Sequence, residues 1–423
     1  MSTDTNLLDD LQWRGLVAHS TDLDALRSAF TTGPVRFYVG FDPTAPSLHM
    51  GNLLQILTAR RLQDAGHVPY ALVGGATGMI GDPKDSGERT LNSLDVVKQW
   101  VERVRAQIEP FLSFDGANAA TMVNNYDWTA GLSTIDFLRD VGKHFPVNRM
   151  LSRETVKRRL ESGISYTEFS YVLLQSMDFL NLYRDHGVTL QFGGSDQWGN
   201  ITGGVELIRR SDGGSAHAFA TPLVTRGDGT KYGKTESGAL WLAPEMMSPY
   251  AFHQFWLNVE DDKAGELLRL FTFLSREQIE DLEAQTAEKP FLRAGQKALA
   301  DEVTALVHGS EETTQAKAAA AALFGGGELA ELDARTLAAA LGEAGATRLP
   351  REDGLLSVVD LLVATGLCRS RGEARRTVSE GGAYVNNVRV QDPDHVPNDS
   401  DLLGGSWLVL RRGKKKLAGI KLG

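Results

Sequence analysis

Apolar positions in the first two hundred residues predict alternating strands and helices. Residues 35–41 (VRFYVGF) and 69–75 (PYALVGG) are β-branched and aromatic runs that end in or next to glycine. Between them, apolar residues from Ser47 to Ala65 keep helical spacing, and Ser47 is the candidate N-cap. A strand, a helix and a second strand in this order predict a parallel sheet. Residues 187–200 (GVTLQFGGSDQWGN) start with a third apolar run, which predicts another strand. The polar residues after this strand should lie at the same edge of the sheet.

The pattern changes to amphipathic helices at about Pro249. The alanine-rich stretch 315–342 predicts a helix, a break at its three glycines and a second helix. From Gly354 onward, two short helices followed by strands predict a small α+β module. We therefore expect an α/β fold in three parts: a parallel-sheet domain over 1–248, a helical domain over 249–345 and the small module over 351–423.

Composition narrows the class of protein. A chain of 423 residues with 42% hydrophobic and 23% charged residues is large enough for several cores. It contains no apolar run of membrane-spanning length and no hydrophobic signal core near its N-terminus, so we expect a cytoplasmic protein without membrane contact. Its single cysteine, Cys368, excludes an intramolecular disulfide and a multi-thiolate metal site.

The net charge of −10 argues against extensive nucleic-acid binding, but the charge is unevenly distributed. Residues 351–423 contain 12 Lys+Arg and 9 Asp+Glu, a net charge of +3, which leaves −13 for residues 1–350. The basic C-terminal end is therefore the candidate contact for a polyanion.

Two segments carry candidate donors for phosphate. His49 and Asn52 lie in the first turn of the predicted helix, where unpaired backbone N–H groups already favour an anion. Residues 230–238 (TKYGKTESG) place Lys231 and Lys234 in a loop of small polar residues. Each segment alone also fits an ordinary helix start or a surface loop. Together they fit stabilisation of charge on transferring phosphates.

These segments resemble the class I aminoacyl-tRNA synthetases, and among them the bacterial tyrosyl-tRNA synthetases. The sequence HMGN is similar to their His-x-Gly-His signature with Asn52 in place of the second histidine, and its amide can still donate a hydrogen bond. KYGKT is similar to their Lys-x-x-Lys-Ser/Thr loop, and YVGFDPTAPSLHMGN, GMIGDP and GGSDQWGN add to the likeness. The resemblance extends from about residue 35 to the C-terminus and implies a Rossmann-like catalytic domain.

The resemblance implies a reaction in two steps. L-Tyrosine and ATP give tyrosyl-adenylate and pyrophosphate, and the tyrosyl group then passes to the 3′-terminal ribose of tRNA(Tyr). It implies catalytic roles for His49, Asn52, Lys231, Lys234 and Thr235. It implies ATP contacts for Asp42, Thr44, Gly51, Gly194, Asp196, Lys231 and Lys234. Magnesium is expected only with ATP, with no permanently bound cofactor and no metal site of the protein. Lys84 and Arg89 are assigned to pyrophosphate or the tRNA acceptor end.

The amino-acid pocket is predicted from both a pattern and the resemblance. Tyr171, Gln175 and Asp178 lie at i, i+4 and i+7 of a predicted helix. A solvent-facing stripe is the alternative, but the other residues are mostly apolar, so we expect a largely buried helix whose polar side chains need partners. The resemblance assigns Asp178 and Tyr38 to the hydroxyl group of the substrate. It assigns Tyr171, Gln175 and Asp82 to the ammonium group, Gln197 to the region of the carboxylate, and Gln191 to the same surroundings.

The C-terminal module resembles a small RNA-binding module first known from a ribosomal small-subunit protein. Its candidate RNA contacts are Arg369, Arg371, Arg375, Arg376, Arg411, Arg412, Lys414 and Lys415, followed by Lys416. A merely solubilising basic tail is the alternative. The resemblance also implies a homodimer, with an interface at about residues 125–165, where HFPVNRML is apolar for a loop.

Three other functions stay open at this point. A tryptophan-specific synthetase is the nearest, although the pair of Tyr38 and Asp178 favours a phenol. An RNA-binding protein without catalysis is opposed by the presence of both Lys231 and Lys234. A small-molecule nucleotidylyltransferase would leave the basic C-terminal module without a role.

Overall fold

The computed structural model describes residues 6–83, 91–227, 229–230, 232, 239–324, 328–351, 355–413 and 416–423. The chain forms two compact units, each with its own core. The first comprises Met1–Ala243 with Gly265–Glu280, and the second comprises Pro244–Ala264 with Asp281–Gly423. The helices α13 (Asp261–Phe271) and α14 (Arg276–Glu288) are divided between the two units. None of the helices in the described part of the chain combines the length and apolar character needed to cross a bilayer.

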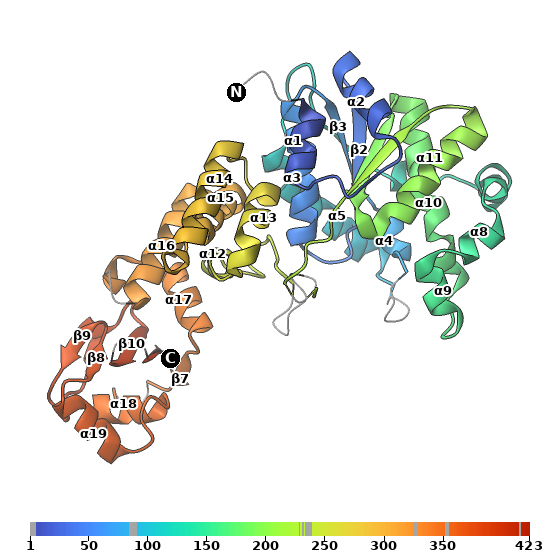
Figure 1. Ribbon diagram of the computed structural model, residues 1–423. Helices are drawn as coiled ribbons and strands as arrows, with labels where there is room; N and C mark the ends of the chain where they lie inside the picture. The colour runs from blue at the N-terminus through green and yellow to red at the C-terminus, as the bar shows by residue number, and fades with distance from the viewer. Residues whose placement is uncertain are drawn as a thin grey trace. The chain divides into compact units, whose positions relative to one another are not determined.

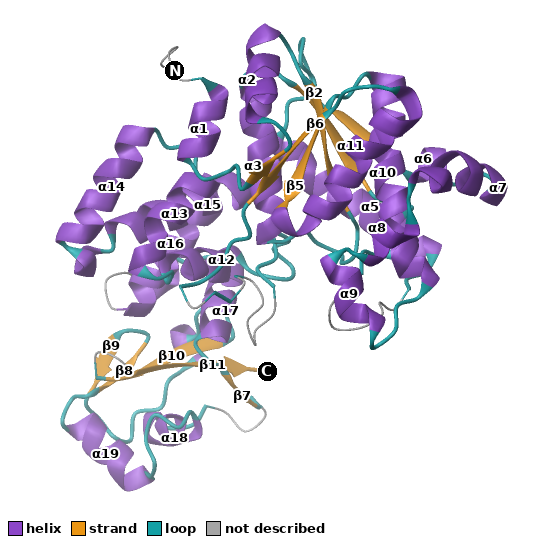
Figure 2. Ribbon diagram, turned by 45° about the vertical axis from the view of Figure 1, so that its right-hand side comes forward, coloured by secondary structure: helices purple, strands orange, loops and turns teal. Residues whose placement is uncertain are grey.

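The first unit is built on a six-stranded sheet in the order β1-β6-β5-β2-β3-β4 (Figure 2). The strands are β1 (His19–Ser20), β2 (Arg36–Phe41), β3 (Val68–Val73), β4 (Thr121–Asn124), β5 (Leu190–Gly194) and β6 (His217–Thr221). All pairs are parallel except β1 with β6. The parallel sheet predicted from the sequence is therefore confirmed.

Helices lie on both faces of this sheet (Figure 1). The chain passes outward from β2 to β4 through α3 (Met50–Asp64) and α5 (Leu94–Ile108), then returns to β5 and moves the other way. Because such crossovers are right-handed, α10 (Tyr166–His186) and α11 (Trp198–Asp212) cover the opposite face. The direction of winding reverses between β2 and β5, which is where doubly wound sheets bind ligands.

Shorter elements complete the first unit. The helices are α1 (Leu7–Trp13), α2 (Leu23–Thr32), α4 (Thr77–Ile80), α6 (Tyr126–Thr129), α7 (Thr134–Asp136), α8 (Val147–Leu151) and α9 (Glu154–Leu160). The 3-10 turns are Glu109–Phe111, Gly142–His144 and Ser195–Gln197, and Phe137–Val141 is a π-helical turn.

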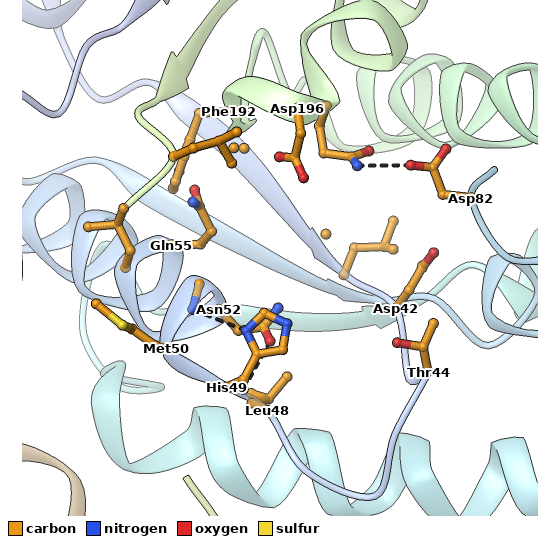
Figure 3. A pocket seen from close by; sticks show the side chains of 18 of the residues that line it. Asp42, Thr44, Leu48, His49, Met50, Asn52, Gln55, Asp82, Phe192 and Asp196 are labelled. Carbon is orange, nitrogen blue, oxygen red and sulfur yellow. Dashed lines mark hydrogen bonds between the residues drawn. The ribbon is translucent and has the colours of Figure 1, made fainter. Parts of the chain in front are cut away.

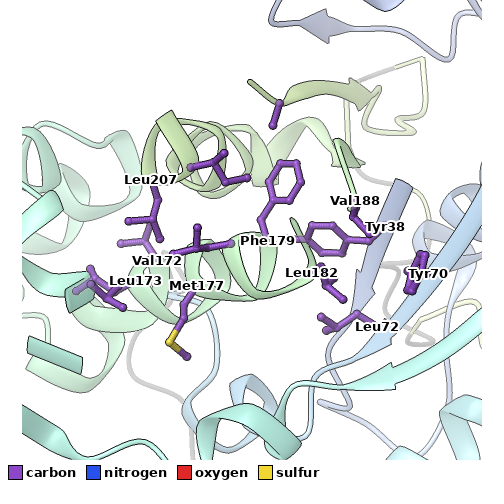
Figure 4. Close-up of a cluster of buried hydrophobic side chains, with 14 of the residues drawn as sticks. Tyr38, Tyr70, Leu72, Val172, Leu173, Met177, Phe179, Leu182, Val188 and Leu207 are labelled. Atoms are coloured by element: carbon purple, nitrogen blue, oxygen red, sulfur yellow. The ribbon is translucent and has the colours of Figure 1, made fainter. Parts of the chain in front are cut away.

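The core beneath α10 fixes this helix against the sheet. Tyr38 of β2 meets Phe179 of α10 edge-on, with ring centroids 5.3 Å apart, and Leu72, Val188 and Leu182 pack around them (Figure 4). Tight packing of this kind leaves the few polar side chains of α10 with defined positions. The expectation of a largely buried helix is confirmed.

The predicted N-cap of α3 was wrong. His49 is the N-cap, and the helix begins at Met50. Ser47 instead donates its hydroxyl to the carbonyl of Leu48, at 2.8 Å, and accepts from the N–H of Ala243, at 3.0 Å. Its hydroxyl is therefore occupied by backbone groups of Leu48 and of the distant Ala243.

The second unit combines helices with a five-stranded sheet in the order β7-β11-β10-β8-β9. Its main helices are α12 (Pro249–Leu257), α15 (Ala294–His308), α16 (Ser310–Phe324), α17 (Ala334–Glu343), α18 (Val358–Ala364) and α19 (Arg371–Ser379). Its strands are β7 (Thr347–Leu349), β8 (Ala383–Val385), β9 (Val388–Val390), β10 (Trp407–Arg412) and β11 (Lys416–Leu422). The 3-10 turns are Pro290–Leu292, Leu329–Glu331 and Asp399–Asp401.

Both faces of this sheet are covered. Alternate residues of β10 point to opposite sides, so Leu408 and Leu410 join the core that includes α18 and α19. Trp407 and Val409 join the core of α16 and α17. The helical region and the α+β module therefore share buried side chains within one compact unit. The glycine break predicted between α16 and α17 lies outside the described residues.

Candidate active site

A cavity of about 620 Å³ lies at the carboxyl ends of β2 and β5, where the winding of the sheet reverses. Its walls come from the loop after β2, the start of α3, the middle of α10 and the turn after β5. The described residues predicted for tyrosine and ATP all line this cavity: Tyr38, Asp42, Thr44, His49, Gly51, Asn52, Asp82, Tyr171, Gln175, Asp178, Gly194, Asp196 and Gln197, with Gln191. Figure 3 shows His49 and Asn52 across the cavity from Asp196 and Asp82.

His49 and Asn52 form a reciprocal capping box at the start of α3. The Nδ1 atom of His49 accepts from the N–H of Gly51, and the Oδ1 atom of Asn52 accepts from the N–H of His49, both at 3.1 Å. Because Nδ1 is the acceptor, neutral His49 carries its proton on Nε2. Because Asn52 uses its oxygen in the cap, its NH₂ group is the part that can donate to a ligand. The helix start thus adds side-chain donors to its backbone dipole.

Most of the predicted lysine loop lies outside the described residues. Lys231, Lys234 and Thr235 are among the loop residues that are not described. Its described flanks nevertheless lie at the cavity, since Tyr232 and Ala239 line it. The segment after the loop is tied to the helix start, because the N–H of Met50 donates to the carbonyl of Leu240 at 3.0 Å. Lys84 and Arg89 also lie outside the described residues.

A buried polar pair forms one end of the cavity. The hydroxyl of Tyr38 is buried and has no hydrogen-bond partner among the described residues. The two carboxylate oxygens of Asp178 accept from Asn125 Nδ2 and from Trp128 Nε1, each at 2.9 Å. Burial raises the pKa of Asp178 to about 7 in spite of these two donors.

Sequence reasoning missed Asn125 and Trp128. They follow β4 in a segment without helical or strand periodicity, so pattern alone did not distinguish them. Their position directly after a parallel strand was the available signal, because such strand ends converge on one edge. Gln55, which lines the cavity one turn after Asn52 and donates to Thr221 Oγ1 at 2.7 Å, was also missed.

Asp42 organises the middle of the cavity. Its Oδ2 accepts from the hydroxyl of Tyr171 at 2.5 Å, and its Oδ1 accepts from Thr77 Oγ1 at 2.6 Å. Burial, followed by the charges of Asp42 and Asp82, raises the pKa of Tyr171. The buried Oε1 atom of Gln175 has no hydrogen-bond partner among the described residues. The middle of the cavity therefore presents carboxylate, amide and hydroxyl oxygens, which suit a cationic group.

Asp82 is held by amides from the segment after β5. Its Oδ2 accepts from Gln197 Nε2 at 3.0 Å, and its Oδ1 accepts from Asn200 Nδ2 at 3.1 Å. The two amides also contact each other, since Asn200 Nδ2 lies 3.0 Å from Gln197 Oε1. Within the described residues, no group of three or more His, Cys, Asp or Glu side chains is arranged to hold a metal ion.

The candidate RNA contacts gather partly around α19, where Arg369, Arg371, Arg375 and Arg376 are exposed. Three arginines of the set form ion pairs: Arg371 with Asp360 at 3.0 Å, Arg375 with Asp394 at 2.8 Å and Arg412 with Glu373 at 2.8 Å.

Arg411 differs from these. It is only 7% exposed because its position in β10 turns it inward, so it does not lie on a surface where phosphate could reach it. Lys414 and Lys415 lie outside the described part of the chain.

Sequence families agree with this architecture. The family described as tRNA synthetases class I (W and Y) matches residues 31–325, and the tyrosine–tRNA ligase SYY-like C-terminal domain matches residues 342–420. The chain belongs to the class I tRNA synthetases of this group. The tyrosine–tRNA ligase of Streptomyces coelicolor is 62% identical over 421 residues, covering 99% of each chain. That of Kineococcus radiotolerans is 61% identical over 413 residues, covering 97% of each. Both of these full-length relatives are tyrosine–tRNA ligases.

A solved structure supports the fold. The C-terminally truncated mitochondrial tyrosyl-tRNA synthetase of Aspergillus nidulans superimposes with a TM-score of 0.67 at 30% identity. The match covers 74% of this chain and 93% of that one.

Proposed function

We propose that this chain is a tyrosine–tRNA ligase. It activates L-tyrosine with ATP to give tyrosyl-adenylate and pyrophosphate, then transfers the tyrosyl group to the 3′-terminal ribose of tRNA(Tyr). ATP enters as its magnesium complex, and the reaction takes place in the cytoplasm. Full-length likeness to tyrosine–tRNA ligases and a cavity at the reversal point of the sheet support the proposal.

The observation that carries the amino-acid specificity is the buried pair of Tyr38 and Asp178. A phenol hydroxyl donates to the Asp178 carboxylate and accepts from Tyr38, so both groups gain a partner. Phenylalanine leaves the buried Tyr38 hydroxyl without a partner and gives Asp178 no donor beyond Asn125 and Trp128, which costs free energy. The indole N–H of tryptophan donates but does not accept, so Tyr38 stays unsatisfied.

The remaining groups of the cavity fit the rest of the reaction. Asp82, Gln175 and Tyr171 hold the ammonium group of tyrosine, and the already ionised carboxylate attacks the α-phosphorus without a general base. His49 Nε2 and the amide of Asn52 donate to the phosphates. The leaving pyrophosphate is bound by Lys231, Lys234 and Thr235. Catalysis rests on positioning and on donors aimed at the developing charge.

In the ATP site, Asp42 and Thr44 lie near the phosphates, and Gly51 lets the nucleotide approach the helix start. Gly194 and Asp196 contact the adenosine ribose.

The tRNA binds the second unit through the exposed arginines around α19. Exposed ion pairs such as Arg371–Asp360 contribute at most about 1 kcal/mol, so phosphates can replace the acidic partners at small cost. Contacts of this kind read the backbone and the shape of structured RNA. The helical part, residues 249–345, approaches the anticodon.

The protein acts as a homodimer through the first unit. Between β4 and α10, large apolar side chains are exposed: Ile135 by 69%, Val147 by 61% and Leu160 by 50%. Tyr166 at the start of α10 is exposed by 67%. Apolar groups gathered over one segment mark an association surface. Sedimentation of Val147→Glu should give monomers where the unchanged chain gives dimers.

The direct test is amino-acid-dependent exchange of labelled pyrophosphate into ATP. Tyrosine should support exchange, and tryptophan and phenylalanine should support very little. Exchange with tryptophan instead would assign the sister specificity. Absence of exchange with every amino acid, combined with tight RNA binding, would favour an RNA-binding protein without catalysis.

A further inference from the structure

Arg153 lies outside the cavity but is connected to it. It precedes α9 as the N-cap residue, in the segment between α8 and α9, and it is half-buried. Its Nη2 donates to Asn200 Oδ1 at 2.7 Å. Asn200 is itself only 7% exposed and does not line the cavity, so its role is exerted through its neighbours.

The guanidinium group determines which way the Asn200 amide faces. Because Oδ1 accepts from Arg153, the NH₂ end points to Asp82 Oδ1, at 3.1 Å, and to Gln197 Oε1, at 3.0 Å. The opposite orientation would place the amide oxygen against the Asp82 carboxylate, where two acceptors repel. It would also deprive Arg153 of its acceptor.

Gly199 leaves room for the contact between Arg153 and Asn200. A Cβ atom on Gly199 would lie 2.7 Å from Arg153 Nη2, so glycine provides the space in which the guanidinium reaches Asn200. Burial lowers the pKa of Arg153, and the negative charge of Asp82 partly offsets that effect. Arg153 and Asp82 therefore attract each other electrostatically, in addition to their link through Asn200.

We propose that Arg153 is a positioning residue for the amino-acid site, acting through Asn200 to hold Asp82 and Gln197 in the orientation that receives tyrosine. The role rests on the proposed function. Without Arg153 the Asn200 amide is oriented by Asp82 and Gln197 alone, so the residues that receive the ammonium and carboxylate groups of tyrosine are held less rigidly. The phosphate side of the cavity, built on the start of α3, is not part of this chain of contacts.

The test compares Michaelis constants in pyrophosphate exchange. For Arg153→Met the KM for tyrosine should rise about tenfold, as expected for a lost hydrogen bond to a charged group, while the KM for ATP stays within about twofold. Arg153→Lys should recover part of the loss, because an ammonium group still donates to Oδ1. Lys157→Met, which removes an exposed charge from α9, is the matched control and should change neither constant.

A double-mutant cycle separates positioning from general stability. In an Asn200→Ala background, Arg153→Met should have no further effect on the KM for tyrosine. Additive effects, or equal increases in both Michaelis constants, would overturn the proposal. If the unchanged protein shows no tyrosine-dependent exchange, the proposed function fails. If it is active and Arg153→Met leaves the KM for tyrosine unchanged, only the positioning role fails.

Discussion

At the scale of single residues, the sequence was informative where a polar side chain interrupted an apolar pattern. Tyr171, Gln175 and Asp178 were expected on one face of a buried helix, and all three line the cavity. Their partners were harder to find, because Asn125 and Trp128 come from a segment without periodicity. Long-range pairing of this kind depends on the tertiary fold rather than on local spacing.

Asp178 gives the site a pH dependence. Burial raises the pKa of Asp178 to about 7, whereas an unperturbed aspartate has a pKa of 3.8. A donated hydrogen bond from tyrosine favours the charged form, so binding lowers this pKa and releases a proton. Tyrosine should bind more weakly as the pH falls from about 8 to about 6.

Calorimetry in two buffers of different ionisation enthalpy measures this proton release. The release should be largest below pH 7, between the pKa values of the free and the liganded Asp178, and small near pH 8, and Asp178→Asn should abolish it. Proton uptake on binding would show that tyrosine is received by the protonated carboxyl group instead.

Gly74 allows β3 to approach Asp42. A Cβ atom there would lie 2.0 Å from Asp42 Oδ1 and 2.3 Å from Thr77 Oγ1. We expect Gly74→Ala to lower the free energy of unfolding by about 1–3 kcal/mol, as overpacked substitutions do. Gly131→Ala, where no atom lies within 4 Å, is the control for urea denaturation. Equal stability of the two variants would mean that the Asp42 network can shift without cost.

At the scale of elements, the strands β2, β3 and β5 and the helix α3 were predicted to within a few residues, but β1, β4, β6 and the cap of α3 were not. Ser47 has the stronger intrinsic preference for an N-cap. The helix start is fixed instead by residues distant in the sequence, since the carbonyl of Leu240 accepts from Met50 and the N–H of Leu242 donates to Leu48. Such contacts override local propensity.

At Asn52, the part played by the side-chain oxygen in the capping box can be tested separately from the part played by the amide donor in catalysis. Asn52→Asp keeps an oxygen that accepts from the N–H of His49 but replaces the donor amide by a negative charge. Folding stability should therefore change by less than about 1 kcal/mol, because a carboxylate is favourable at a helix N-terminus. The single-turnover rate of adenylate formation should fall by about tenfold or more. Asn52→His, which retains a donor, should keep most of the rate. An unchanged rate in Asn52→Asp would remove residue 52 from the chemistry.

At the scale of the whole molecule, the sequence led us to expect three domains, and the last two turn out to share a core. Trp407 and Val409 of β10 pack with α16 and α17, as does Gly419, whose Cβ would lie 3.0 Å from Leu341. The sequence did not indicate this shared core, because a short strand with apolar residues on both faces does not show which helices pack against each face. Deleting residues 351–423 would therefore expose that core, and loss of activity in such a truncation would not report on RNA binding.

Substitution of surface charges is the sharper test of the second unit. Replacing Arg369, Arg371, Arg375 and Arg376 by glutamine should leave pyrophosphate exchange unchanged and reduce tRNA charging. The salt dependence of tRNA binding should also become shallower by the number of lost phosphate contacts. Arg335→Gln on α17 is the control. Unchanged charging would place the RNA contacts elsewhere.

We propose above all that the buried end of the cavity, at Tyr38 and Asp178, recognises a phenol. The most direct measurement is the ratio of kcat/KM for tyrosine to kcat/KM for phenylalanine in the unchanged protein and in Tyr38→Phe. We expect the ratio to fall by about tenfold or more in Tyr38→Phe, because only tyrosine loses a hydrogen bond. An unchanged ratio would contradict it.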